Sequence, residues 1–337
     1  MINILVTGAG GGVGQGIIKS LKLIEDLDIR LITADMSHLA SGLYAGDYSY
    51  LVPAASDGNY FEKIAEICVK EKVHYYFPGT DVELIFCAEN AEKLYEMINV
   101  KIIVSDLSVI EIADDKLKTV IFLENNNFSY PKTWLPEAVE WDSMHFPLIV
   151  KPRVGCRSIG VHLVQNINEA MSAIESLTNP IVQEFIDGDE YTCTVAIYNN
   201  VISDVLCLKR DLRAGDTFRA FPVKSEIIES YVRDIAVKLN ISGSCNFQLR
   251  LDRNMTPKLF EINSRFSGTT PFCSYLGFNP VEFCLKNDLG LSYTCQIDYE
   301  KIVLRHWAEI VVQKSQLDNI KANSSGNITS PIVSLML

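Results

Sequence analysis

Polar side chains at every second position mark two apolar segments, residues 245–250 and 258–263. Side chains alternate between the two faces of a strand, so the segments are predicted to form a hairpin with a polar face on each strand. A turn centred on residues 254 and 255 brings two pairs of side chains about 5 Å apart at their Cβ atoms. These pairs are Gln248 with Glu261 and Asn246 with Asn263. The same alternation puts Leu259 on the face of Glu261.

Gln248, Glu261 and Asn263 are therefore predicted to bind a metal ion. They offer only oxygen atoms, which Mg²⁺ takes as ligands while leaving its remaining sites to water and nucleotide phosphates. A polar outer face of a sheet would show the same alternation, but it would not account for a lone acid among amides. Arg265 follows two residues after Asn263 and stays within reach of a phosphoryl group in transfer.

A lysine at the end of a predicted strand is a candidate phosphate ligand. Lys151 closes the apolar residues 147–151, and a loop rich in Gly, Ser and Arg follows at residues 153–160. Such a loop can fold over phosphate oxygens. Lys116 stands earlier in the chain, at the start of a helical stretch, and is a second candidate. The alternative for Lys151 is a solvated lysine at a strand end.

Residues 181–190 predict a strand, a glycine turn and a second strand. A strand that links two subdomains can offer a free carbonyl and amide to the edge of adenine. The carboxylate of Glu190, just after the turn, can accept the ribose hydroxyls. An ordinary hairpin is the alternative.

Six residues in three further segments are candidates for substrate binding: Asp81, Glu83, Arg210, Arg219, Ser267 and Gly268. The two arginines flank Gly215 in a segment expected to be mobile, which suits the clamping of a carboxylate or acyl phosphate; a solvated basic loop is the alternative. The two acids begin a helix and could bind an amine, although helix capping also explains them. The last two residues follow the hairpin and are expected near the acceptor.

A glycine-rich turn, residues 8–14, follows the first predicted strand and opens a helix, where dinucleotide folds bind phosphate. Asp35 closes the next strand, where such a fold binds ribose. The spacing is that of short-chain dehydrogenases, but no tyrosine is followed four residues later by the lysine that those enzymes need. An NAD-dependent dehydrogenase is therefore a remote alternative, and a tight turn without a nucleotide is preferred.

The elements around these residues predict two architectures. Strand and helix patterns alternate through residues 1–108, which predicts an α/β, doubly wound parallel sheet. Residues 109–300 show an α+β pattern. We divide them into a smaller subdomain, residues 109–182, and a larger one, residues 183–300, that carries the metal site. Residues 301–337 form a C-terminal extension, polar and turn-rich, that is expected to be peripheral.

Composition narrows the class of protein further. The formal net charge of −12 at pH 7 argues against a nucleic-acid partner. No stretch approaches the ~20 apolar residues of a membrane span, and the first residues lack the basic start of a signal peptide. The nine cysteines form no CxxC pair, so neither a zinc site nor a disulfide framework is expected. A cytoplasmic protein without membrane partners is predicted.

Taken together, residues 1–300 resemble the ATP-grasp superfamily, especially short proteins similar to one half of the carbamoyl-phosphate synthase large subunit. The amino-terminal part resembles a preATP-grasp domain through its glycine-rich opening, Asp35 and residues 78–83. The rest resembles a single ATP-grasp domain of two subdomains through an ordered set of residues: Lys116, Lys151 with its loop, residues 183–190, Gln248, Glu261, Asn263 and Arg265.

The resemblance implies a role for each candidate. The α- and β-phosphates of ATP are held by Lys116 and Lys151, and the β- and γ-phosphates are covered by the loop with Arg153, Ser158, Ile159 and Gly160. Adenine is bound by Gln183, Glu184, Phe185 and Ile186, and ribose by Glu190. One or two Mg²⁺ ions, with Mn²⁺ as a substitute, are ligated by Gln248, Glu261 and Asn263. The catalytic cations are Arg265, Lys151 and Arg210.

The implied reaction transfers the γ-phosphoryl group of ATP to a carboxylate, and an amine then attacks the acyl phosphate. We therefore expect an amide-forming ligase of small-molecule carboxylates and amines, with an amino acid as substrate, and the resemblance suggests a homodimer. The alternatives are a small-molecule kinase, a phosphorylating enzyme similar to carbamoyl-phosphate synthase and a nucleotide-sensing module. Carbamoyl-phosphate synthesis itself is not expected, because only one ATP-grasp copy is present.

Overall fold

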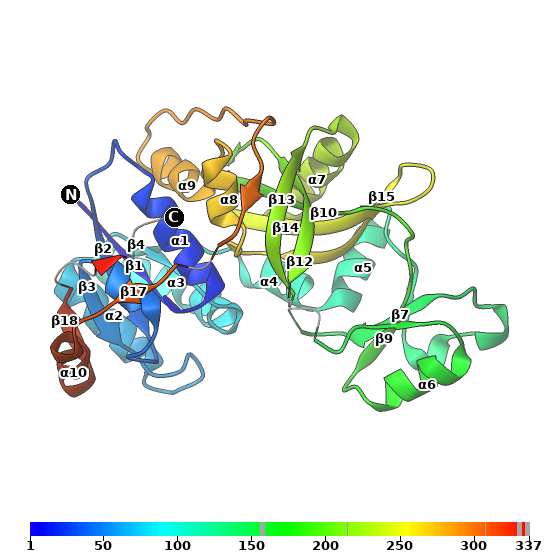
Figure 1. Ribbon diagram of the computed structural model, residues 1–337, viewed down its shortest axis with the longest axis horizontal. Coiled ribbons are helices and arrows are strands. Elements are labelled where there is room, and N and C mark those ends of the chain that lie inside the picture. Colours follow the sequence, from blue (N-terminus) through cyan, green and yellow to red (C-terminus); the bar gives the residue numbers. More distant parts are fainter. Residues whose placement is uncertain (156–158, 214, 307, 329–331, 334–337) are drawn as a thin grey trace.

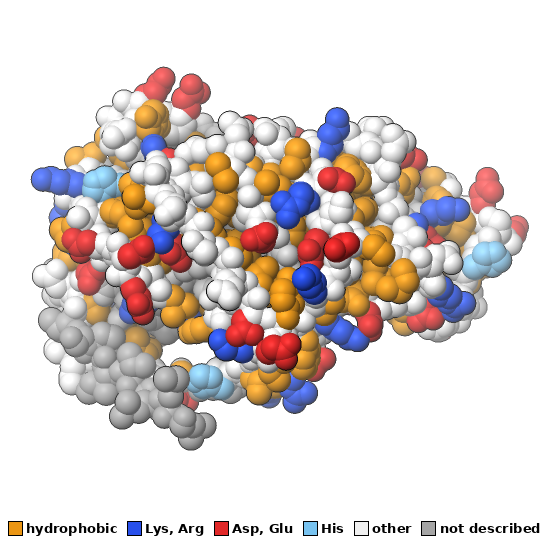
Figure 2. Space-filling model, turned by 90° about the horizontal axis from the view of Figure 1, so that it is seen from above, with side chains coloured by type: hydrophobic (Ala, Val, Ile, Leu, Met, Phe, Trp, Pro, Cys, Tyr) orange, Lys and Arg blue, Asp and Glu red, His pale blue; other side chains and the backbone are white. Residues whose placement is uncertain are grey.

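The computed structural model describes residues 1–155, 159–213, 215–306, 308–328 and 332–333. The molecule is elongated, with an amino-terminal sheet at one end, a large antiparallel sheet in the centre and a small sheet at the other end (Figure 1). In the described part of the chain, no helix is long and apolar enough to cross a membrane. On the face shown in Figure 2, basic and acidic side chains are interspersed and the described residues form no continuous basic patch.

The amino-terminal sheet has the predicted doubly wound, parallel architecture. Its strand order is β18-β3-β2-β1-β4-β5, and all pairs except β18–β3 are parallel. The strands are β1 (Ile2–Val6), β2 (Ile29–Asp35), β3 (Tyr48–Leu51), β4 (Tyr75–Phe77) and β5 (Lys101–Ile102). Helices α2 (Tyr60–Glu71) and α3 (Leu84–Ile98) cover one face, and α1 (Gly12–Lys22) covers the other. The strand β3 was not predicted.

The small sheet follows two helices, α4 (Leu107–Asp114) and α5 (Lys116–Asn125). Its strand order is β6-β9-β7-β8, with antiparallel neighbours throughout. The strands are β6 (Thr133–Trp134), β7 (Leu148–Pro152), β8 (His162–Val164) and β9 (Pro180–Glu184). Helix α6 (Ile167–Glu175), which was not predicted, packs its alanines against the apolar side of β7.

The large sheet has the order β15-β14-β10-β12-β13-β16, and β11 pairs with β10. Its strands are β10 (Glu190–Tyr198), β11 (Val201–Ile202), β12 (Leu206–Arg213), β13 (Asp216–Val223), β14 (Gly243–Leu251), β15 (Pro257–Asn263) and β16 (Val303–Leu304). Helix α7 (Glu226–Leu239) packs on one face. Helices α8 (Thr270–Tyr275) and α9 (Pro280–Asp288) lie between the other face and α1 and so connect the two sheets.

A register shift inside the β14–β15 hairpin decides which side chains face the site. The predicted register is confirmed where Gln248 pairs with Glu261, but the next pair is Leu249 with Leu259. Phe260 is therefore the extra residue of a bulge, which reverses the alternation of β15 from that point. Leu259 is fully buried in the core beneath the sheet. The prediction that it shares the face of Glu261 is wrong.

Two further segments form regular structure. The segment around Gly215, for which a solvated basic loop was the alternative, is a pair of antiparallel strands, β12 and β13. The C-terminal extension contains β17 (Ile310–Val311), α10 (Lys314–Asn323), β18 (Ser325–Asn327) and β19 (Ile332–Val333). Strand β18 extends the amino-terminal sheet beside β3, and β16 extends the large sheet beside β13. The extension is thus attached to an edge of each sheet, and its part beyond Lys314, expected to be turn-rich, contains α10 and β18.

Candidate active site

Two cavities meet at Gln248 and Glu261, which line both of them. The first, called the apolar cavity, lies between the small sheet and the β14–β15 hairpin, and its lining includes Lys116, Lys151, Gln183, Phe185, Ile186, Glu190, Arg250 and Phe260. The second, called the polar cavity, lies between the hairpin, β13 and the start of α1, and its lining includes Gly12, Val13, Asp81, Arg210, Thr217, Asn263, Arg265, Ser267, Gly268 and Arg305.

The two predicted phosphate-binding lysines lie in the apolar cavity. Lys151, next to last in β7, has only 4% of its surface exposed. Its Nζ donates to Gln183 Oε1 at 2.8 Å and lies 5.4 Å from the centre of the Phe260 ring. Burial lowers the pKa of Lys151 to about 7, against the opposing attraction of Glu261. Lys116 is also buried and donates to the Gly155 carbonyl at 2.9 Å. Each lysine is thus held in place by a neutral acceptor, which leaves its charge available to an anion.

The predicted adenine and ribose residues follow along β9 and into β10. The side chain of Gln183 bridges Lys151 and Thr133, with its Nε2 donating to Thr133 Oγ1 at 2.8 Å. The Glu184 side chain points away from Gln183 and accepts from the Lys132 amide at 3.1 Å. Both side-chain groups are thereby engaged within the protein, so this strand can meet a ligand in the cavity chiefly through its backbone and through Phe185 and Ile186.

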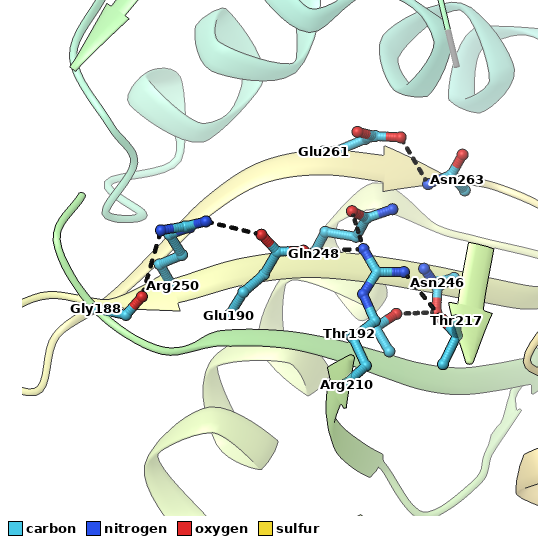
Figure 3. A network of polar contacts seen from close by, with 10 residues as sticks. All are labelled: Gly188, Glu190, Thr192, Arg210, Thr217, Asn246, Gln248, Arg250, Glu261 and Asn263. Atoms are coloured by element: carbon cyan, nitrogen blue, oxygen red, sulfur yellow. Dashed lines mark hydrogen bonds and ion pairs between the residues drawn. The ribbon is translucent and has the colours of Figure 1, made fainter. Parts of the chain in front are cut away.

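Glu190 is the centre of a network of two arginines (Figure 3). Its two carboxylate oxygens pair with Arg210 and Arg250, each at 3.0 Å. Arg250 reaches it from β14 and also donates to the Gly188 carbonyl at 3.4 Å. Arg210, from β12, donates in addition to Gln248 Oε1 at 2.6 Å. Arg210 thus holds Glu190 and Gln248 together across the three strands, a contact that its predicted catalytic role did not include.

The three predicted metal ligands converge at the junction of the cavities, but they are not equally free. Glu261 accepts a hydrogen bond from Asn263 Nδ2 at 3.2 Å, and among the described residues no lysine or arginine lies within ion-pair distance of its carboxylate. An acid at the mouth of two cavities without a cationic partner fits a metal ion. Gln248 and Asn263 fit less well, because the Oε1 of Gln248 already accepts from Arg210 and the Oδ1 of Asn263 from Arg265. The pair of Asn246 with Asn263 is confirmed, and Asn246 accepts from Thr192 at 2.7 Å.

Arg265 links the β14–β15 hairpin to the amino-terminal sheet. Its guanidinium forms an ion pair with Asp81, which follows β4, and donates to Asn263 Oδ1 at 3.2 Å. Ser267 and Gly268 line the same polar cavity, as expected for residues near an acceptor. Asp81 therefore faces an arginine, so an amine that bound there would have to share the carboxylate with Arg265.

Several predicted residues lie elsewhere. Glu83 is buried and accepts hydrogen bonds from four hydroxyl groups, those of Thr7, Tyr60, Tyr76 and Thr80. Its carboxylate serves the amino-terminal fold, so the expectation that it binds a substrate amine does not hold. Arg219 lies on the exposed side of β13, 3.5 Å from Asp211, and lines neither cavity. The expectation that it clamps substrate does not hold either.

The predicted phosphate loop is seen only in part. Arg153 pairs with Asp115 at 2.6 Å instead of pointing into the apolar cavity, because Asp115 caps the start of α5 beside it. Ile159 lines that cavity with 72% of its surface exposed. Gly160 packs beneath it with a positive φ of 72°, which favours glycine. Ser158 lies outside the described residues.

The glycine-rich turn is closed by its own acid. Asp35 accepts a hydrogen bond from the Gly10 amide at 2.8 Å and from the Ser37 amide at 2.9 Å. The carboxylate that would bind ribose in a dinucleotide fold therefore already accepts hydrogen bonds from the turn, which argues against the dehydrogenase alternative. The start of α1 faces the polar cavity instead, through Gly12 and Val13.

Three lining residues were missed from the sequence. Phe260 enters the apolar cavity only because of the bulge in β15. Arg250 was placed on the polar face but given no role, although its spacing from Gln248 could have revealed it. Arg305 lies in the extension, and no local pattern in the sequence marks it as part of a cavity formed by residues far from it in the chain.

Comparisons with known proteins match two parts of the chain. Residues 113–269 match the ATP-grasp domain, and residues 4–103 match the PylC-like N-terminal domain. The carbamoyl phosphate synthase large chain of Helicobacter pylori is 26% identical in an alignment of 320 residues that covers 80% of this chain and 27% of that protein. The D-alanine–D-alanine ligase A of Bacillus cereus is 40% identical over 60 residues, 17% of this chain and 20% of that one. The chain thus spans about a quarter of the length of the first of these relatives.

Solved structures share the fold at low sequence identity. N5-carboxyaminoimidazole synthetase from Staphylococcus aureus, complexed with ADP, superimposes with a TM-score of 0.71 at 15% identity, over 96% of this chain and 85% of that one. The L-amino acid ligase from Bacillus licheniformis gives a TM-score of 0.68 at 17% identity, over the same shares of the two chains. At these identities the likeness concerns the fold alone.

Proposed function

We propose, from the match of residues 113–269 to the ATP-grasp domain and of residues 4–103 to the PylC-like N-terminal domain, that the chain is an ATP- and Mg²⁺-dependent carboxylate–amine ligase. The observation that carries the proposal is Glu261, a carboxylate without a cationic partner among the described residues, at the junction of an apolar and a polar cavity. One cavity suits a nucleotide and the other a small polar substrate, so a phosphoryl group would pass between them at Glu261.

In this proposal ATP binds in the apolar cavity. The adenine lies against Phe185 and Ile186 and meets the backbone of β9, because the side chains of Gln183 and Glu184 are engaged elsewhere. Lys116 and Lys151 bind the phosphates, since both are buried and neither is neutralised by an acid at ion-pair distance among the described residues. Glu190 binds the ribose only in competition with its two arginines.

The γ-phosphate then points toward Glu261 and Asn263. These residues, joined by Gln248 once Arg210 releases it, would hold Mg²⁺, which supplies charge neutralisation to the phosphoryl group; Mn²⁺ in its place stays a prediction. Arg265 faces the same point from the polar cavity and stabilises charge on the acid being phosphorylated. Asp81 holds the guanidinium of Arg265 in that position.

The identities of the acid and the amine are not implied by the fold, and carbamoyl-phosphate synthesis is not proposed, because the chain spans only a quarter of its relative in that family. An amino-acid substrate, a homodimer and the domain boundaries at residues 108, 182 and 300 stay predictions.

The test is ADP release from ATP and Mg²⁺ across a matrix of amino acids, hydroxy acids and amines, with Glu261→Gln in parallel. The substitution keeps the shape of the side chain and removes its charge, so turnover should fall about 100-fold or more. Glu111→Gln is the matched control, because Glu111 is an exposed acid paired with Lys118, and it should keep full turnover.

A new amide in the product and loss of turnover in Glu261→Gln would support the ligase. A phosphorylated acid that accumulates without an amide would identify a kinase instead. Unchanged turnover in Glu261→Gln would refute the metal assignment.

A further inference from the structure

The polar cavity contains three arginines, and two of them are neutralised by acids. Arg210 is paired with Glu190 and Arg265 with Asp81. Among the described residues, no carboxylate lies within ion-pair distance of Arg305, the third. A guanidinium that lines a polar cavity without an acid partner is a site for an anion.

Arg305 is fixed in position at three points. It follows β16, and its amide donates to the Phe218 carbonyl on β13 at 2.9 Å. Its Nη2 donates to the Gly268 carbonyl at 2.5 Å, and its guanidinium lies 4.8 Å from the centre of the Phe272 ring. One edge of the guanidinium is therefore used by the protein, and the remaining N–H groups are available to a ligand in the cavity.

The electrostatic surroundings also favour an anion. The pKa of Lys19, which lies on α1, is lowered first by burial and then by repulsion from Arg305. Burial lowers the pKa of Arg305 as well, and Asp216, an exposed acid that also lines the polar cavity, opposes that effect without coming within ion-pair distance. The first amides of α1 open on the cavity at Gly12 and Val13, and no hydrogen bond to either amide is found among the described groups. The polar cavity thus offers an anion one guanidinium without an acid at ion-pair distance and two backbone donors without a partner among the described residues.

We propose that Arg305, with the start of α1, binds a second anionic group of the acid substrate, a carboxylate or a phosphate, apart from the carboxylate that is phosphorylated beside Glu261 and Arg265. The inference rests on the proposed ligase function and narrows its substrate to an acid with two anionic groups. It also gives residues 301–306 of the extension a part in substrate selection.

The test measures selectivity with hydroxylamine in place of the amine, because hydroxylamine attacks an acyl phosphate to give a hydroxamate and inorganic phosphate. The probes are pairs of acids that differ at the far end: butyrate with succinate, alanine with aspartate, and glycerate with 3-phosphoglycerate. The wild-type protein should prefer at least one doubly anionic member by about tenfold or more in kcat/KM. The first two pairs test whether the second anionic group is a carboxylate, and the third pair tests whether it is a phosphate.

Arg305→Ala should abolish the preference without the same loss for the singly anionic acid, and Arg305→Lys should restore part of it. Lys301→Ala, which removes an equal charge from the same segment where Lys301 pairs with Asp298, should keep the preference. Because Arg305→Ala removes contacts to Gly268 and Phe272, Gly12→Asp is a second variant. A Cβ atom at Gly12 meets nothing within 4 Å, and an acid suits the first turn of a helix, so the added negative charge should lower the preference in a folded protein.

The outcomes separate the two proposals. If the wild-type protein forms no hydroxamate from any acid, the ligase proposal fails and this inference fails with it. If hydroxamates form without preference for a second anionic group, or if Arg305→Ala and Gly12→Asp leave the preference unchanged, only this inference is overturned. If Arg305→Ala lowers kcat/KM by the same factor for both acids of each pair, Arg305 holds Gly268 in place and does not select substrate.

Discussion

Lys151 should make nucleotide binding depend on pH near neutrality. Its pKa is lowered to about 7 by burial, and phosphate oxygens favour the charged form. Below pH 7 the lysine is already charged, so binding requires no protonation. Above pH 7 the lysine must first take up a proton, so nucleotide affinity should fall as the pH rises. Between pH 6 and pH 8 the charged fraction falls about tenfold, which corresponds to about 1.4 kcal/mol of binding free energy.

The assay is calorimetric titration of ADP with Mg²⁺ between pH 6 and pH 8.5. The nucleotide itself titrates in this range, so Lys151→Arg, which remains charged throughout, is measured beside the wild-type protein. The ratio of the two Kd values should change about tenfold between pH 6 and pH 8, and at pH 7 the wild-type protein should take up about half a proton more than the variant on binding. A ratio that stays constant across this range would show that Lys151 is charged in the free protein or does not contact the nucleotide.

The other predictions concern the fold around the site. Glu83→Gln should lower the free energy of unfolding by about 1–3 kcal/mol, because four hydroxyl donors meet the carboxylate; denaturant titration measures this, and a raised KM with unchanged stability would restore its substrate role. Leu259→Ala should cost about 2–5 kcal/mol of stability because Leu259 is fully buried, whereas Phe260→Ala should weaken ADP binding more than the fold. Equal stability losses in these two variants would contradict the bulge.

Local patterns in the sequence predicted much of the fold and the metal hairpin. The alternation of strands and helices through residues 1–108 is confirmed in the doubly wound sheet. The pairing of Gln248 with Glu261 is confirmed as well, because a hairpin joins segments only a few residues apart and its turn sets the register. The hairpin depends on contacts between near neighbours in the chain, and the doubly wound sheet follows from the alternation of strand and helix patterns, so the order of residues carries the information.

Contacts between distant segments decided the rest. The bulge brings Phe260 into the apolar cavity. It depends on the packing of β15 against the core and on its pairing with β14. Arg210 on β12 pairs with Glu190 on β10. The sequence of neither strand indicates that the two lie side by side in the sheet. Arg305 reaches the polar cavity because a strand from the extension adds to β13. The sequence by itself determined which chemical groups the chain carries and which near neighbours pair. Only the tertiary structure decided which charges neutralise one another, because burial and ion pairing depend on residues that meet across long intervals of the chain.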